Sequence, residues 1–145
     1  MADVAGLAAA FSAVVEAIKG ALGGMRETKA ARRKRASRVC AAVARNLETL
    51  HAELEAWANA PKAKRHIAGK KLHAPLGELK TYVGELSELF DGLMNRQKLG
   101  ALQRRLGALL RSKAFALDID AMPETLPKEL LGLSGEFKGL ANTLA

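Results

Sequence analysis

The chain has 145 residues and a formal net charge of +8, and its composition is 49% hydrophobic and 26% charged. These values describe one folded domain rather than a disordered polyelectrolyte. Aromatic residues make up only 4%, so leucine, alanine and valine must supply the core, which favours packed helices over a sheet. Cys40 is the single cysteine, which excludes an internal disulfide and fits a reducing, intracellular setting.

The first predicted helix spans residues 3–22 and is unusually apolar. Between residues 5 and 24 only Glu16 and Lys19 are charged, and alanine recurs at every fourth position from 5 to 21. Glycines 23 and 24 predict its end. Its uncharged run is shorter than the roughly 20 residues of an ordinary transmembrane helix, and no cationic region precedes it as in a secretory signal. We therefore expect a chain that is soluble at rest. The apolar seam, in steps of three and four, is formed by Val4, Leu7, Phe11, Val14, Ile18 and Leu22.

Four further helices are predicted at residues 26–59, 72–95, 98–113 and 124–144. Each carries apolar residues in steps of three and four, and no stretch alternates with the period of a strand. Pro61 ends the longest of them. The sequence therefore predicts one all-α domain over residues 1–145. We expect an up-and-down four-helix bundle with an additional short helix and coiled-coil-like packing.

Residues suited to catalysis or metal binding are not grouped in the sequence. Cys40 and His51 would lie about 16 Å apart along a helix, too far for a nucleophile and its base. His66 and His73 lack further zinc ligands. The acidic pair Asp118 and Asp120 lacks the glycine and third ligand of a calcium loop. We therefore predict no catalytic, cofactor-binding or metal-binding residues, and a protein that is not an enzyme.

Positive charge is concentrated in the middle of the chain. Residues 26–113 hold 20 Lys and Arg against 8 Asp and Glu, whereas residues 114–145 hold 2 against 5. This favours a polyanionic partner, either an anionic phospholipid membrane or nucleic acid. Specific nucleic-acid recognition is disfavoured because the aromatic residues mostly fall on apolar seams, which leaves a non-specific nucleic-acid binder as an alternative.

Three clusters contain most of these basic residues, and the first two are predicted to contact lipid. In an antiparallel bundle, we expect these two near opposite ends of the molecule. The first consists of Arg26, Lys29, Arg32, Arg33, Lys34, Arg35 and Arg38. The second consists of Lys62, Lys64, Arg65, Lys70 and Lys71. The third includes Arg96, Lys98, Arg104, Arg105 and Arg111.

The order of segments resembles a known family of helical bundles. An apolar first helix is followed by "MRETKAARRKRASRVCAAVARNLETL", "LHAPLGELKTYVGELSELFDGL", "NRQKLGALQRRLGALL" and "LPKELLGLSGEFKGLANTLA". This order is similar to that of the N-terminal four-helix-bundle domain of mixed-lineage kinase domain-like proteins and of the related fungal HeLo and plant resistance-protein bundles. The resemblance implies a cell-death or immune-defence module that oligomerises and permeabilises membranes, controlled by an upstream receptor or kinase-like domain.

Combined with that resemblance, the charge pattern predicts a bundle that is cytoplasmic at rest and membrane-associated when activated. The basic clusters would dock on anionic lipid, copies would associate into homo-oligomers, and the first helix would be released into the bilayer. A non-enzymatic helical adaptor or scaffold remains the alternative from another class. The residues predicted to insert are Leu7, Phe11, Val14, Val15, Ile18 and Leu22.

Overall fold

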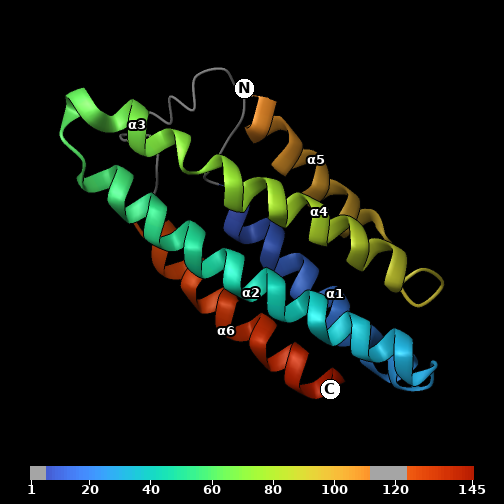
Figure 1. Cartoon of the computed structure of the whole chain (residues 1–145). Coiled ribbons are helices and arrows are strands. Elements are labelled where there is room, and N and C mark those ends of the chain that lie inside the picture. The colour runs from blue at the N-terminus through green and yellow to red at the C-terminus, as the bar shows by residue number, and fades with distance from the viewer. Residues whose placement is uncertain (1–5, 112–123) are drawn as a thin grey trace.

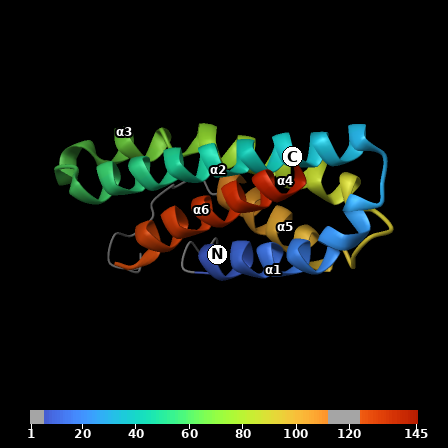
Figure 2. The same cartoon turned by 90° about the horizontal axis from the view of Figure 1, so that it is seen from below.

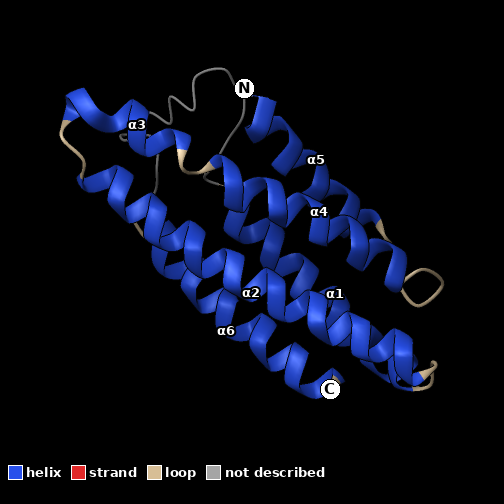
Figure 3. Ribbon diagram, in the orientation of Figure 1, coloured by secondary structure: helices blue, strands red, loops and turns tan. Residues whose placement is uncertain are grey.

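The computed structural model describes residues 6–111 and 124–145, and the regular elements in this part of the chain are all helical (Figure 3). The prediction of an all-α fold is therefore confirmed for these residues. The five long helices are α1 (Leu7–Arg26), α2 (Ala30–Asn59), α4 (His73–Leu89), α5 (Gln97–Arg111) and α6 (Leu126–Leu144). Two short elements, η1 (Lys62–Lys64) and α3 (Arg65–Lys70), connect α2 to α4 (Figure 1).

The five long helices form a closed ring around one apolar core. Going round the ring, α1 contacts α6, α6 contacts α2, α2 contacts α4, α4 contacts α5, and α5 contacts α1 again. The last helix of the chain thus packs against both of the first two (Figure 2). Helices α1 and α6 run in the same direction, because Ala8 and Glu129 line one end of the groove between them and Leu22 and Thr143 line the other.

The apolar seam of α1 lies in the core. Leu7, Phe11, Val14 and Ile18 are each at most 1% exposed. The ring of Phe11 meets that of Phe137 from α6 edge to face, with 6.2 Å between the ring centroids and an interplanar angle of 86°, a favoured aromatic geometry. The spacing of apolar residues therefore identified the buried face correctly from Leu7 to Ile18, whereas Leu22 is half-buried and residue 4 lies outside the described residues.

Several predicted helix boundaries differ from the observed ones. Helix α1 does not end at residues 23 and 24 but continues to Arg26, because the fully buried Met25 side chain offsets the roughly 1 kcal/mol that each glycine costs in a helix. Helix α4 ends at Leu89 rather than at residue 95, and the turn after it contains Gly92 with a φ of +79°. Residues 62–70, which fall between two of the predicted helices, are helical. The predicted positions 3–5 and 112–113 lie outside the described residues.

Candidate functional site

The first two basic clusters lie at opposite ends of the molecule, as predicted. Helix α2 separates them, and its 30 residues extend over about 45 Å. Figure 1 shows the α1–α2 connection at one end of the bundle and α3 at the other. We call residues 26–38 the loop end and residues 62–71 the tip.

Within the loop end, Arg32 is engaged by the protein itself. Its Nε donates a hydrogen bond to the main-chain oxygen of Leu89 at 2.7 Å, and its Nη2 donates to that of Asp91 at 2.8 Å. Arg35 has a longer contact, with Nη2 4.0 Å from Glu85. Arg32 therefore links the first turn of α2 to the end of α4 and to the connection that follows it, and its Nε and Nη2 are engaged by these two main-chain oxygens.

The other cations of the loop end face solvent to different degrees. Arg33 is half-buried. Through Asp91, the structure also brings a member of the third cluster to this end, since Arg96 Nε lies 3.6 Å from Asp91 Oδ1. Local sequence patterns could not predict that Arg32 and Arg96 both contact Asp91, because Arg32 and Asp91 are 59 residues apart. The exposed side chains of the cluster are Arg26, Lys29, Lys34, Arg35 and Arg38.

The tip combines cations with an exposed apolar side chain. Ile67 of α3 is 52% exposed, one of two large apolar side chains exposed in the described part of the chain. Residues 56–77 contain no Asp or Glu, so nothing in this segment neutralises the positive charge. The charge pattern of the sequence predicts the cations of this surface, but Ile67 belongs to no periodic apolar pattern and has no such signal. The exposed cations around it are Lys62, Lys64, Lys70 and Lys71, and Arg65 is half-buried.

Helix α1 is long and apolar enough to cross a membrane, as judged by length and composition alone. In this conformation it is a core helix. Five of the six residues predicted to insert are buried, and Leu22 is half-buried. Insertion would therefore require α1 to leave its position between α5 and α6.

Cys40 and His51, the cysteine and histidine considered as a nucleophile and its base, each have an environment that the fold explains. Burial raises the pKa of the Cys40 thiol to about 12. His51 Nδ1 lies 2.7 Å from the main-chain oxygen of Pro127, and His51 Nε2 lies 3.6 Å from Glu55. In residues 6–111 and 124–145, no group of three or more His, Cys, Asp or Glu could hold a metal ion. The pair at residues 118 and 120 lies outside the described residues.

Comparison with known proteins gives no match, whether to a family model, to a curated protein or to a solved structure. A function for this chain must therefore be argued from its own surfaces.

Proposed function

We propose that this protein binds anionic membrane surfaces through its tip and its loop end. The observation that carries the proposal is the exposed Ile67 among the cations of a segment that has no carboxylate. An apolar side chain flanked by lysines suits the membrane interface, where the apolar group enters the acyl boundary and the cations face anionic headgroups.

The magnitudes favour reversible docking at the tip. Each cation near an anionic surface contributes roughly 1 kcal/mol, and burying an isoleucine side chain contributes about 1.5–3 kcal/mol. The tip holds five such cations, Lys62, Lys64, Arg65, Lys70 and Lys71. Together with Ile67, their favourable free energy would outweigh the conformational entropy that this short connection loses on docking.

Release of α1 into the bilayer is the second step of the proposal. Taking α1 out of the core exposes its apolar seam to water, but insertion into hydrocarbon removes that seam from water again. The opposing terms are Glu16 and Lys19, each of which costs roughly 2.5–3.5 kcal/mol at the centre of a bilayer. Association of several copies around a water-filled lumen would keep these two side chains hydrated.

The resemblance to the mixed-lineage kinase domain-like and HeLo bundles belongs to the same proposal. It includes an up-and-down four-helix arrangement, a role in cell death or defence, and control by an upstream receptor or kinase-like domain. The described helices are compatible with such a bundle, with α5, the shortest of the five long helices at 15 residues, as the additional short helix predicted at residues 98–113. We propose a cytoplasmic resting state and a membrane-associated activated state on this basis.

Cosedimentation with vesicles tests the docking step. The protein is mixed with vesicles of phosphatidylcholine alone or with added phosphatidylserine, and a variant carrying Ile67→Asp and Lys70→Glu is compared with one carrying Leu131→Asp and Arg104→Glu. We expect binding only to the anionic vesicles, lost in the tip variant and retained in the control, which has the same charge change and also alters an exposed leucine.

Equal loss of binding in both variants would contradict a specific role of the tip. Binding to duplex DNA that weakens with salt, without vesicle binding, would instead support the non-specific nucleic-acid alternative. Binding to neither polyanion would leave the adaptor or scaffold bundle as the better explanation.

A further inference from the structure

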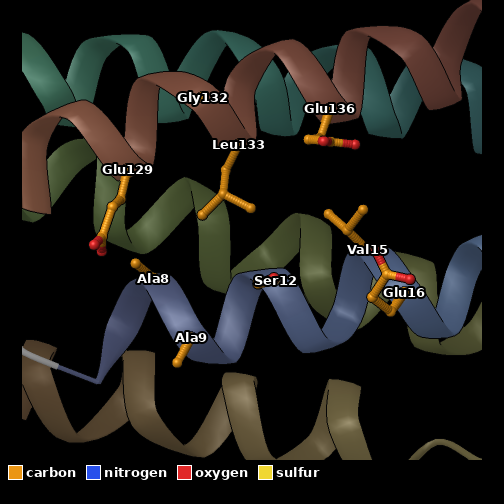
Figure 4. A pocket seen from close by; sticks show the side chains of 9 residues that line it. All are labelled: Ala8, Ala9, Ser12, Val15, Glu16, Glu129, Gly132, Leu133 and Glu136. Carbon is orange, nitrogen blue, oxygen red and sulfur yellow. The ribbon is translucent and has the colours of Figure 1, made fainter.

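A groove between the parallel helices α1 and α6 has acidic walls. Glu16 of α1 and Glu129 and Glu136 of α6 line it, and Lys19 is the one cation among the described residues that line it. Lys19 Nζ lies 3.1 Å from Glu136 Oε2 and 3.5 Å from Glu16 Oε1. Figure 4 shows the three carboxylates on the facing sides of the two helices. The described lining residues, three carboxylates and one ammonium, have a formal balance of −2 on a chain of +8.

The walls of this acidic groove permit close approach by another molecule. Gly132, Gly135 and Gly139 of α6 line it, and a Cβ built on any of them would meet nothing within 4 Å. Ala8 and Ala9 line it from the side of α1. Nearby on α6, Leu131 is 46% exposed.

A second groove, between α2 and α4, has the opposite charge. Among the described residues, Arg35, Arg38 and Arg45 line it together with one carboxylate, that of Glu85, which gives a formal balance of +2. Arg35 lies near Glu85, whereas Arg38 and Arg45 are exposed and make no ion pair within the described residues. The half-buried ring of Tyr82 also lines this basic groove.

The two grooves open on different sides of the bundle. The pairs α1–α6 and α2–α4 share no helix in the ring. In Figure 1, α2 and α4 face the viewer, whereas in Figure 2 the α1–α6 pair is seen with α1 on the far side of the bundle from α2. Two surfaces on different sides of one copy cannot both belong to a single two-fold interface. A contact between them is heterologous, and such a contact repeats from copy to copy.

We propose that copies of this chain associate side by side, with the basic α2–α4 groove of one copy against the acidic α1–α6 groove of the next. A second copy is the occupant because one chain carries both charge patterns. The contact uses the sides of the bundle: it includes Arg35 and Arg38 of the loop end, and it leaves the tip free for lipid. The inference rests on the self-association in the proposed function and specifies its surfaces, and it is tested without lipid.

Sedimentation velocity over a range of protein concentrations, at low and high salt, tests this contact. An acid-reversed variant carries Glu16→Lys and Glu129→Lys, and a base-reversed variant carries Arg38→Glu and Arg45→Glu. We expect the mass of the wild-type protein to rise above the 15.4 kDa of one chain with concentration, and to fall with salt. Each variant alone stays at the mass of one chain, while an equal mixture of the two regains the higher mass.

Two controls have matched changes in net charge outside both grooves. Glu78→Lys with Glu88→Lys matches the acid-reversed variant, and Lys98→Glu with Arg104→Glu matches the base-reversed one. We expect both controls to associate like the wild type, and circular dichroism establishes that every variant is folded. A wild-type protein that stays at one chain mass at low salt, or controls that lose association as fully as the groove variants, overturns the proposal. The acid-reversed variant is also tested for binding to anionic vesicles. If it binds them, a lack of self-association is distinguished from a failure of membrane docking.

Discussion

The Nε of Arg32, in the first turn of α2, donates a hydrogen bond to the main-chain oxygen of Leu89, the last residue of α4, at 2.7 Å. Carbonyl oxygens at the end of a helix have no donor within that helix, and the helix dipole places partial negative charge there. A guanidinium supplies both the missing hydrogen-bond donors and a positive charge. Within a cluster predicted to contact lipid, this residue therefore stabilises the fold.

Replacing Arg32 by alanine should lower the free energy of unfolding by about 1–2 kcal/mol, because a charged donor to two carbonyl oxygens is lost. The neighbouring Lys34 is exposed, and its replacement by alanine should change stability by less than about 0.5 kcal/mol. Urea unfolding followed by circular dichroism measures both values. Equal effects of the two substitutions would show that the Arg32 contacts are not stabilising.

The edge-to-face pair of Phe11 and Phe137 predicts how firmly α1 is held. Phe137→Ala removes a fully buried ring and should lower the free energy of unfolding by about 3–5 kcal/mol. It leaves the sequence of α1 unchanged. If α1 inserts into membranes after release, this variant should release dye from anionic vesicles faster than the wild-type protein.

Phe11→Ala is the matched control, because it loosens the same contact from the other side. This substitution also removes a large apolar side chain from the helix that is proposed to insert. We expect similar destabilisation in urea but no comparable gain in dye release. Equal dye release by both variants would indicate that general unfolding, rather than α1, disrupts the vesicles.

The sequence allowed the helices and their buried faces to be predicted because steps of three and four place leucines on one side of a helix. The ring order was not predictable in this way, since the packing of α6 against both α1 and α2 depends on contacts between distant segments. For the same reason, the pairing of Arg32 with Leu89 and the acidic groove, built from residues 8–22 and 129–143, appear only in three dimensions. Ile67 lies in α3, whose six residues are too few to show a helical period of apolar residues.

Cys40 should be almost unreactive in the folded protein. Its pKa is raised from 9.0 to about 12 by burial, which reduces the thiolate fraction near pH 8 by about a thousandfold. Reaction with a disulfide reagent should therefore be slow in buffer and rapid in urea. A variant with Cys40→Ala and a cysteine at the exposed position of Ala56 should react rapidly in both, and rapid reaction of native Cys40 would contradict its burial.

The ion pair between Glu48 and Lys138 predicts part of the acid sensitivity. A hydrogen bond from Lys138 is the main cause that lowers the pKa of Glu48 from its ordinary 4.5, and Ser134 adds a hydrogen bond at 3.2 Å. A lowered pKa in the folded state contributes stability that is present above pH 4.5 and is lost as the pH falls through the folded-state value. Glu48→Gln should therefore unfold more easily than the wild type at pH 7, with a smaller difference at pH 3. A difference that does not shrink on acidification would contradict this origin.

At Gly135, a substitution that stabilises α6 should weaken self-association. It is an exposed helical residue, and a Cβ at this position meets no atom within 4 Å. Gly135→Ala should therefore raise the free energy of unfolding by up to about 1 kcal/mol, through the better helix propensity of alanine. The same methyl group fills part of the acidic groove, so the concentration needed for association should rise. Gly77→Ala on α4 is the control, because it also has open space and lies outside both grooves. Thermal unfolding should show stabilisation of both variants, while sedimentation velocity should show weaker association only for Gly135→Ala. Unchanged association in that variant would mean that neighbouring copies do not approach the glycines of α6.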